Sequence, residues 1–324
     1  MTEKLFKKGD VIFREGDEGD SLFDISEGTV GIFVNYGAEG EQKLTELKSG
    51  QFFGEMAVIE AYPRSATAVA LDDVKAFEIS CGDMNGYFES QPDRIVAIMK
   101  HLSSRIRALS NDYAEVSGAI NEFGKSDVQS GSFIDKIKKF ANIYKHSKNT
   151  ANVDSAETRR KISQTSHADG FINKVESYSK GTIIFKEGET GNCMYDIHGG
   201  TVGIYKGYGT PEEKRLAELG MNKFFGEMGM VDNDVRSATA VALEDMTTVE
   251  IISVDDLTEL FTKNAPKVEM ILAHMSYRLR TLTNSYMDAC KLANDVSDAA
   301  ASGNVSDELK KKAGSFQPEY YVNI

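Results

Sequence analysis

Two stretches of the chain alternate short apolar runs with glycine and aspartate, and a stripe of apolar residues at helical spacing follows each of them. The first stretch, residues 10–34, reads "DVIFREGDEGDSLFDISEGTVGIFV", and the second, residues 182–206, reads "TIIFKEGETGNCMYDIHGGTVGIYK". Short apolar runs separated by turn residues at this spacing predict the strands of a small barrel or sandwich. The segments "SATAVALDDVKAFEIS" and "SATAVALEDMTTVEII" add further strands, each pair joined by an acidic turn.

After each strand-rich stretch the apolar period changes to steps of four and three. This spacing predicts a long helix with a coiled-coil-like seam, although a helix lying on its own barrel is an alternative. A helix of 25 residues is about 38 Å long, which is more than a small barrel covers, so the seam is favoured. The two seams can pair within one chain or across a homodimer. The apolar positions are Ile95, Met99, Leu102, Ile106, Leu109, Tyr113, Val116 and Ile120 in the first stripe, and Val268, Leu272, Met275, Leu279, Leu282, Tyr286, Ala289, Ala293 and Val296 in the second.

The chain is an internal duplication. A constant offset of about 172 residues carries Gly54 onto Gly226, Arg64 onto Arg236 and the "GTVGI" at 28–32 onto the "GTVGI" at 200–204. Roughly 60 residues align in this way without a gap. Two copies this far apart indicate two similar domains rather than a solenoid, which needs at least three short repeats.

We therefore expect a first domain at residues 1–123, a linker at 124–172, a second domain at 173–300 and a tail at 301–324. The linker is polar and contains one amphipathic helix in "SFIDKIKKFANIY", begun by a capping box. The tail ends in aromatic residues that can dock elsewhere on the protein. The apolar face of the linker helix consists of Phe133, Ile137, Phe140 and Tyr144, and its capping box pairs Ser132 with Asp135.

Composition narrows the choice of partners. The formal net charge of the 324-residue chain is −13, which argues against nucleic acid or an acidic membrane surface as the main partner. The sequence contains 3 cysteines, far apart, as is typical of a reducing compartment. The start lacks the apolar region of a signal peptide, and the chain lacks a run of about 18 apolar residues. We expect a cytoplasmic protein.

Both copies contain the same glycine-flanked loop, "FFGEMAVIEAYPRSATAVAL" at 52–71 and "FFGEMGMVDNDVRSATAVAL" at 224–243. An arginine guanidinium matches phosphate oxygens, and a glycine before a short helix lets backbone N–H groups approach an anion. A phosphate does not explain Glu55, whereas a sugar hydroxyl does, because a carboxylate accepts its hydrogen bond. Phosphate and sugar together indicate a nucleotide. The alternative is that Glu55 and Arg64 merely form a salt bridge.

The two loops resemble the phosphate-binding cassette of the cyclic nucleotide-binding domain family, which includes the catabolite activator protein and the regulatory subunits of cAMP-dependent protein kinase. The resemblance covers nearly all of residues 5–120 and 177–296. It implies an α+β fold in which two eight-stranded, jelly-roll-like β-rolls are each followed by a long C-terminal helix and are joined by a partly helical linker. It also implies that no cofactor is needed besides the nucleotide ligand.

The resemblance assigns roles to individual loop residues. Glu55 and Glu227 would bind the ribose 2′-hydroxyl, and Arg64 and Arg236 would bind the cyclic phosphate. The remaining loop positions would supply backbone amides, hydroxyls and the tight turn. These positions are Gly54, Met56, Ala57, Ser65 and Ala66 in the first copy, and Gly226, Met228, Gly229, Ser237 and Ala238 in the second.

The base would meet the long helix. Ser110 and Asn111 in the first copy, and Thr283 and Asn284 in the second, lie off the seam and can hydrogen-bond adenine. Tyr113 and Tyr286 can stack on a base, but their seam positions favour core packing. A serine after the arginine resembles the cAMP-binding activator proteins of this family, which implies cAMP rather than cGMP, and a cyclic dinucleotide stays open.

The copies differ before the arginine, where the second loop carries Asp232 and Asp234. If these carboxylates face Arg236, each costs on the order of 1 kcal/mol of phosphate binding. We therefore expect the second site to bind more weakly.

The sequence shows no helix-turn-helix pattern, no Walker loop and no kinase signature, and its five histidines lack the spacing of metal ligands. It therefore predicts a cyclic nucleotide receptor that is not an enzyme and that controls an unknown effector protein. Two alternatives stay open: a scaffold whose pockets are degenerate, and an adaptor that binds an acidic partner through the lysine-rich linker. The basic stretch "RRKIS" at 159–163 is expected to be a solvated turn.

Overall fold

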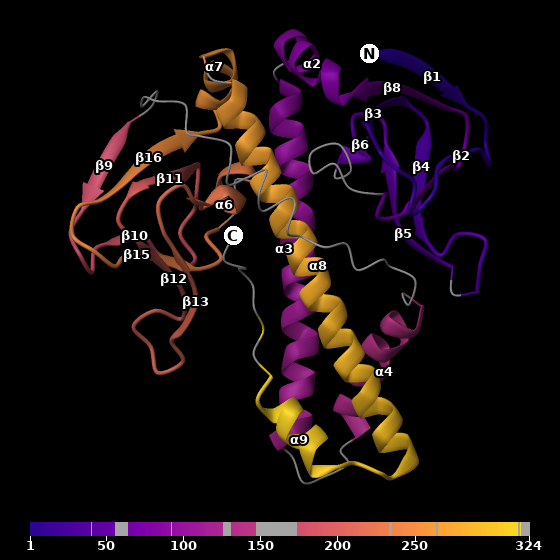
Figure 1. The fold of residues 1–324 in the computed structure, drawn as a ribbon, viewed down its shortest axis with the longest axis vertical. Helices are drawn as coiled ribbons and strands as arrows, with labels where there is room; N and C mark the ends of the chain where they lie inside the picture. The colour runs from indigo at the N-terminus through magenta and orange to yellow at the C-terminus, as the bar shows by residue number, and fades with distance from the viewer. Residues whose placement is uncertain are drawn as a thin grey trace. The chain divides into compact units, whose positions relative to one another are not determined.

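The computed structural model describes residues 1–39, 41–55, 64–91, 93–125, 131–146, 174–232, 235–263, 265–316 and 318. The chain forms two compact units. The first unit contains the described residues of Met1–Ile79, Ala108–Val153 and Arg280–Glu319. The second contains those of Ser80–Arg107 and Asp154–Leu279. Each unit thus combines one β-structure with helical segments from distant parts of the sequence (Figure 1).

The first β-structure is built from eight strands in two four-stranded antiparallel sheets. Their order is β1-β8-β3-β6 in one sheet and β2-β7-β4-β5 in the other. The strands are β1 (Thr2–Phe6), β2 (Val11–Phe13), β3 (Ser21–Glu27), β4 (Thr29–Val34), β5 (Gln42–Lys48), β6 (Phe52–Phe53), β7 (Thr67–Ala70) and β8 (Val74–Ser80).

The second β-structure repeats this topology strand for strand. Its sheets have the orders β14-β11-β16-β9 and β10-β15-β12-β13, which are the first two orders with every strand number raised by eight. The duplication and the eight-stranded β-roll predicted from the sequence are therefore confirmed. The strands are β9 (Val175–Tyr178), β10 (Ile183–Phe185), β11 (Cys193–Gly199), β12 (Val202–Lys206), β13 (Lys214–Leu219), β14 (Phe224–Phe225), β15 (Thr239–Ala242) and β16 (Thr247–Ser253).

An aromatic pair lies at the centre of each barrel core. Phe23 stacks on Phe53 with ring centroids 4.9 Å apart, and Tyr195 stacks on Phe225 at the same distance. Aliphatic residues from both sheets pack around each pair. Alternation along the strands brings these side chains to one face, and burying that face between two sheets drives the fold.

The helices follow and flank the barrels. They are α2 (Met84–Ser90), α3 (Asp93–Lys125), α4 (Gly131–His146), α6 (Glu227–Asp232), α7 (Asp256–Lys263), α8 (Ala265–Ser302) and α9 (Asp307–Gly314). A single-turn 3₁₀ helix, η1 (Cys81–Asp83), precedes α2. All the apolar stripe positions of α8 are buried, as are those of α3 apart from the half-buried Leu109. The two long helices are thus confirmed, whereas their pairing as a seam stays a prediction.

The linker helix expected from the sequence is α4. Ile137 and Phe140 on its predicted apolar face are buried, and Tyr144 is half-buried. The side chains of Phe133, Ser132 and Asp135 lie outside the described residues, so the capping box stays a prediction.

The helix α9 was missed in the sequence, where residues 301–324 were expected to be a tail. Ser306 caps its N-terminus by accepting a hydrogen bond from the Leu309 amide at 3.2 Å. Acidic residues follow in the first turn and lysines in the last, which is the charge order that the helix dipole favours. This cap and this charge order were the overlooked signal.

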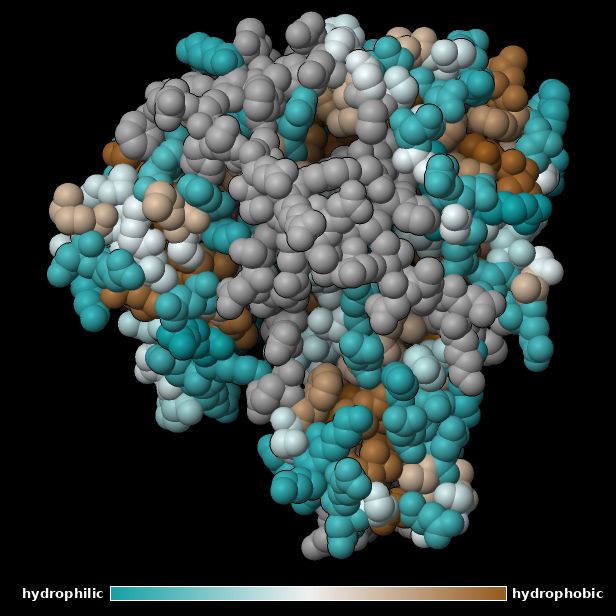
Figure 2. All heavy atoms as spheres, viewed as in Figure 1, coloured by the Kyte–Doolittle hydropathy of each residue, from teal (hydrophilic) through white to brown (hydrophobic). Residues whose placement is uncertain are grey.

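Figure 2 shows apolar side chains in several patches among hydrophilic side chains. Exposed large apolar side chains such as Leu5, Met221 and Met246 are scattered along the chain. Among the described helices, none combines the length and the apolar character that crossing a membrane requires.

Candidate functional site

Main-chain hydrogen bonds hold the backbone of the arginine in each repeated loop. The Arg64 amide donates to the Asp17 carbonyl at 2.8 Å, and the Arg64 carbonyl accepts from the Gly16 amide at 2.8 Å. In the second copy the Arg236 amide donates to Glu189 at 2.7 Å, and its carbonyl accepts from Gly188 at 2.9 Å. Both arginines are therefore positioned by a turn about 50 residues earlier in the sequence.

The Arg64 side chain turns into the barrel, where it is 6% exposed. Its Nη1 donates to the carbonyl oxygen of Gly54 at 2.8 Å, and its Nη2 lies 3.4 Å from the hydroxyl of Ser21. The guanidinium carbon lies 4.2 Å from the centroid of the Phe13 ring, in cation–π contact. Its Nε is buried without a hydrogen-bond partner among the described residues.

Arg236 repeats this geometry in the second barrel, where it is 5% exposed. Its Nη1 donates to Gly226 O at 2.5 Å, and its Nη2 donates to the carbonyl of Cys193 at 2.8 Å. The guanidinium carbon lies 4.3 Å from the centroid of Phe185. Cys193 occupies the place of Ser21, so a thiol replaces a hydroxyl beside the second arginine.

The glycine before the acid makes this arrangement possible. Gly54 and Gly226 have φ of +77° and +79°, a conformation that residues with a Cβ rarely adopt. A Cβ on Gly54 would lie 2.5 Å from Nη1 of Arg64, and one on Gly226 would lie 2.8 Å from Nη1 of Arg236. Both positions therefore favour glycine for their conformation, and a Cβ at either one would displace the guanidinium.

Neither arginine pairs with the glutamate of its own loop. The hydrogen bonds of Arg64 go to Gly54 and Ser21, although Glu55 is buried at 2% exposure. In the second copy Glu227 forms an ion pair with Arg278 of α8 rather than with Arg236. The alternative in which the loop acid and arginine merely form a salt bridge is therefore wrong in both copies.

A buried guanidinium without a carboxylate partner carries an electrostatic penalty. Burial lowers the pKa of Arg64, and the more distant charges of Asp20 and Glu55 oppose this effect. An anion placed against the guanidinium would relieve the penalty, because an opposite charge stabilises the ionised form. Each barrel thus holds a buried, positively charged guanidinium that donates a hydrogen bond to a main-chain carbonyl.

The short helix expected after the loop glycine is present in the second copy as α6, which begins at Glu227. Met228 is buried, and so is Met230, the residue after Gly229. Ala66 and Ala238 are buried, whereas Ser65 and Ser237 are exposed. Met56 and Ala57 lie outside the described residues, as do Asp234 and the side chain of Asp232.

The residues expected to meet the base lie on the two long helices. Ser110 and Asn284 are half-buried, and Asn111 and Thr283 are exposed. Their contact with a base stays a prediction. Tyr113 and Tyr286 are 2% and 7% exposed, which confirms their packing role.

Two further arginines reach the second loop, and sequence reasoning missed both. Arg278 of α8 binds Glu227, and Arg107 of α3 donates to the Met228 carbonyl at 3.1 Å. Both belong to the matching helix segments "RIRALSNDY" and "RLRTLTNSY". The repeated arginines in these segments were the available signal.

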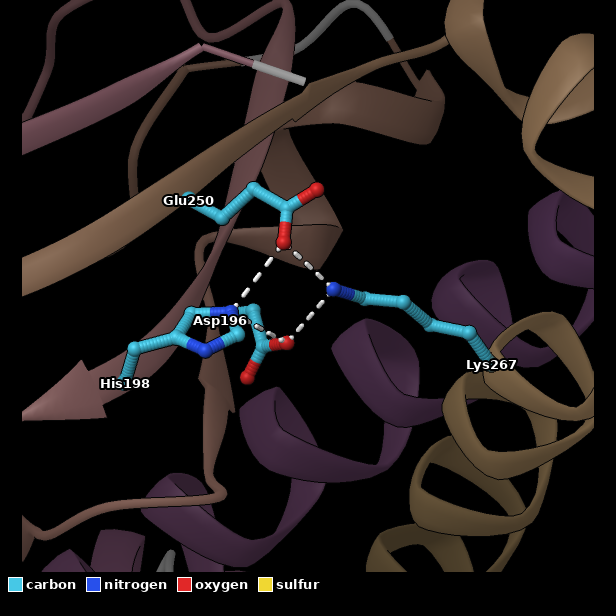
Figure 3. Close-up of polar contacts among 4 residues, drawn as sticks. All are labelled: Asp196, His198, Glu250 and Lys267. Atoms are coloured by element: carbon cyan, nitrogen blue, oxygen red, sulfur yellow. Dashed lines mark hydrogen bonds and ion pairs between the residues drawn. The ribbon is translucent and has the colours of Figure 1, made fainter. Parts of the chain in front are cut away.

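A buried charge cluster joins α8 to the second barrel (Figure 3). Asp196 and Glu250, both 0% exposed, face each other across β11 and β16, and Nζ of Lys267 lies 2.8 and 2.6 Å from their oxygens. Nε2 of His198 lies 3.2 and 3.1 Å from the same two carboxylates. Opposed like charges destabilise a sheet, so a cation between them is required.

The cluster combines residue types that ligate metals, since one atom each from Asp196, His198 and Glu250 lie within 4.8 Å of one another. Sequence spacing did not reveal this group, because the three residues come from two strands. The ammonium of Lys267 already contacts both carboxylates, so the lysine supplies the positive charge that a metal would bring.

Two barrels of one topology, each with a glycine-bound buried arginine and a buried acid, define a tandem ligand-binding protein. The chain belongs to the cyclic nucleotide-binding domain family, whose model matches residues 3–91 and 175–264.

Among curated relatives, the cAMP-dependent protein kinase regulatory subunit of Debaryomyces hansenii is 29% identical over 75% of this chain and 42% of its own length. The cGMP-dependent protein kinase of Plasmodium berghei is 26% identical over 74% of this chain and 21% of its own length. The chain thus spans less than half the length of these relatives. Among solved structures, the regulatory domain of Toxoplasma gondii PKA with cAMP is 19% identical, with a TM-score of 0.25 over 84% of this chain and 83% of that chain.

Proposed function

We propose that this chain is a receptor for a cyclic nucleotide, with cAMP as the favoured ligand, and that it regulates an effector protein rather than catalysing a reaction. The observation that carries the proposal is the pair of buried arginines, Arg64 and Arg236, each hydrogen-bonded to a glycine carbonyl and free of its loop glutamate. A buried cation of this kind is suited to bind a phosphate.

The ligand would be held at two points. The guanidinium would bind the cyclic phosphate, and the buried Glu55 or Glu227 would accept the ribose 2′-hydroxyl. Glu227 can do so while paired with Arg278, because a carboxylate offers about four acceptor positions. One buried guanidinium balances one negative charge, which favours the singly charged phosphodiester of a cyclic mononucleotide over the more highly charged phosphate of 5′-AMP. The relatives include a regulatory subunit of a cAMP-dependent kinase and a cGMP-dependent kinase. The preference between adenine and guanine therefore has to be measured.

We propose that the effector is a protein. We also propose that the receptor itself acts in the cytoplasm. The curated relatives named above are a kinase regulatory subunit and a kinase. Ser110 and Asn111 of α3, with Thr283 and Asn284 of α8, are proposed to close over the base. Ligand contact that exists only in the closed state is what shifts a conformational equilibrium.

Titration calorimetry with cAMP, cGMP, a cyclic dinucleotide and 5′-AMP tests the proposal. The wild-type chain is expected to bind two equivalents of a cyclic mononucleotide. Gly54→Ala is expected to bind one, because its Cβ would displace Nη1 of Arg64 from the Gly54 carbonyl.

Gly50→Ala is the matched control. Gly50 also has a positive φ, +86°, but a Cβ there meets nothing within 4 Å. Both variants therefore carry the backbone strain, and only Gly54→Ala disturbs the arginine. Gly50→Ala is expected to keep two sites.

Thermal unfolding supplies a second measurement. A ligand at 100 times its dissociation constant stabilises a site by about 2.7 kcal/mol. If no cyclic nucleotide shifts the unfolding of the wild-type chain, the receptor proposal fails and the scaffold alternative is preferred.

A further inference from the structure

The C-terminal segment 303–316 leaves the end of α8 and packs on the end of α3. We name this segment, Gly303–Phe316, the strap. By sequence, α3 follows the first barrel and α8 follows the second. The strap therefore joins the helices that belong to the two different binding domains, and all of its contacts described here lie within the first compact unit.

The reversal between α8 and α9 is well defined. Gly303 has φ of +71°, and its amide donates to the Ala300 carbonyl at 3.3 Å. The Asn304 amide donates to Ala299 at 3.0 Å, and Ser306 then caps α9. Since both helix ends are capped, the strap starts from a fixed direction.

The strap meets α3 through three kinds of contact. Gly124 and Gly314 lie so close that a Cβ on Gly124 would be 2.0 Å from the Gly314 nitrogen. Nδ2 of Asn121 donates to the Phe316 carbonyl at 3.0 Å. The Phe316 ring packs edge-on against Tyr113, with centroids 6.5 Å apart. Ala313 of α9 is fully buried, and Figure 1 shows α9 beside the end of α3.

The strap is a low-stability element. An isolated helix of eight residues is not stable in water, so the helical form of α9 depends on docking. Ala313 is the buried residue of α9, and elements with few buried contacts open at a small free-energy cost. A contact of this size can be made and released without unfolding either barrel.

A second helix also connects α3 with α8. Nζ of Lys139 on α4 pairs with Glu115 of α3 at 3.1 Å, and Lys145 pairs with Asp298 of α8 at 2.9 Å. The Phe140 ring packs edge-on against Tyr286 of α8, with centroids 6.3 Å apart. The distal ends of α3 and α8 are thus tied twice, by α4 and by the strap.

We propose that the strap is a regulatory tie that couples the two nucleotide sites by fixing the end of α3 to the end of α8. This inference rests on the proposed function. Tyr113, the partner of Phe316, lies two residues after Asn111 on α3. A helix that moves over a base at Asn111 therefore moves the docking surface of the strap, and with it the end of α8. Two sites that bias one such element are thermodynamically coupled, in both directions.

The first test concerns docking and needs no ligand. Hydrogen exchange of residues 307–316 is measured in the full chain for the wild type, Gly124→Ala and Gly118→Ala. Both glycines lie in α3, so both substitutions raise helix propensity by about 1 kcal/mol. A Cβ at Gly118 meets nothing within 4 Å, whereas one at Gly124 collides with the backbone of Gly314.

Gly124→Ala is expected to speed exchange of α9 at least tenfold and Gly118→Ala to leave it unchanged. Phe316→Ala, which removes the ring contact with Tyr113, is expected to speed it as well. Equal protection of α9 from hydrogen exchange in the two glycine variants would overturn the docking of the strap on α3. Protection that depends on protein concentration would overturn it too, because α9 would then dock on a second copy of the chain.

The second test concerns coupling. The affinity of the second site for cAMP is measured with the first site filled and with the first site removed by Arg64→Leu. The ratio of the two affinities is expected to be about fivefold or more in the wild type and in Gly118→Ala, within the usual range of allosteric coupling. In Gly124→Ala this ratio is expected to fall below the wild-type value, with α4 as the remaining tie between α3 and α8.

The outcomes separate the two proposals. An undocked strap with an unchanged affinity ratio would overturn the coupling role while leaving the receptor function intact. If no cyclic nucleotide binds the wild type, the receptor function and the coupling fail together, and the exchange experiment still decides whether the strap docks.

Discussion

Arg278 of α8 forms an ion pair with Glu227, the first residue of the short helix α6 in the second arginine loop. The side chains are 14% and 8% exposed, so the pair is largely shielded from water. The helix α8, which follows the second barrel, therefore fixes the position of Glu227, the acid that is proposed to bind the ribose. The loop and α8 cannot move independently while this pair persists.

Breaking this pair from one side is expected to destabilise the chain. Arg278→Met leaves the Glu227 carboxylate buried without its partner, and we expect a loss of about 3 kcal/mol in the free energy of unfolding. Urea denaturation followed by circular dichroism measures it. Glu227→Gln combined with Arg278→Met is expected to recover most of the loss, because no unpaired charge remains. A double variant as unstable as the single one would contradict the ion-pair account.

Lys267 is expected to be the main electrostatic support between α8 and the second barrel. Lys267→Met would leave Asp196 and Glu250 fully buried and opposed, at a cost of about 3–5 kcal/mol. Lys263→Met is the control, since Lys263 pairs with Glu259 one turn away at the surface, where such pairs contribute about 0.3–0.5 kcal/mol.

The charge-balanced variant Asp196→Asn, Glu250→Gln, Lys267→Met separates charge from packing. It is expected to be more stable than Lys267→Met alone. If Lys267→Met and Lys263→Met differ by less than about 1 kcal/mol, the cluster does not support α8 as described.

His274 of α8 makes stability depend on pH. Burial, together with the charges of Lys223 and Arg278, lowers the pKa of His274 from 6.5 to about 4. Its Nε2 is buried without a hydrogen-bond partner among the described residues, and its ring packs edge-on against Phe224. The folded state therefore holds His274 neutral, whereas the unfolded chain takes up a proton below pH 6.5.

Because the folded pKa is the lower one, the stability linked to His274 is full above pH 6.5. It falls by at most about 3 kcal/mol as the pH drops to 4. Urea denaturation of the wild type and His274→Leu across this range checks the expectation. Other acidic groups titrate in both proteins, so the difference between the two curves isolates the histidine. His101→Leu, at the matching place on α3, controls for loss of a helix histidine.

The two nucleotide sites are expected to differ in affinity. Arg236→Leu leaves the first site, Arg64→Leu leaves the second, and calorimetry of each variant measures the remaining site. The first site is expected to bind several-fold more tightly. The second loop carries two acids before its arginine, Asp232 and Asp234, where the first carries one, and each carboxylate that faces Arg236 would cost on the order of 1 kcal/mol. A tighter site in the Arg64→Leu chain would reverse this order.

The barrels and the two arginine loops could be predicted from the sequence, because the residues that specify them are close along the chain and occur twice. Gly54 and Arg64 recur as Gly226 and Arg236 at the same separation, and the alternation of apolar and turn residues specifies short strands. The apolar stripes of α3 and α8 were equally readable, since helical burial follows a 3.6-residue period.

The partners of the loop residues could not be predicted in this way. Glu227 and Arg278 are 51 residues apart, and no local pattern distinguishes this arginine from Arg236 as the partner of the acid. The cluster of Asp196, Glu250 and Lys267 depends on the pairing of β11 with β16 and on the position of α8. Strand register and helix docking are set by the whole core.

The sequence by itself determined the duplication, the strands, the long helices and the two arginine loops, because each is specified by neighbours along the chain. The tertiary structure alone decided that each arginine binds a glycine carbonyl, that α8 holds the second loop acid, and that the C-terminal strap returns to α3. These contacts join residues 10 to about 195 positions apart. Their formation depends on packing free energy that is shared over the whole fold, which no short stretch of sequence contains.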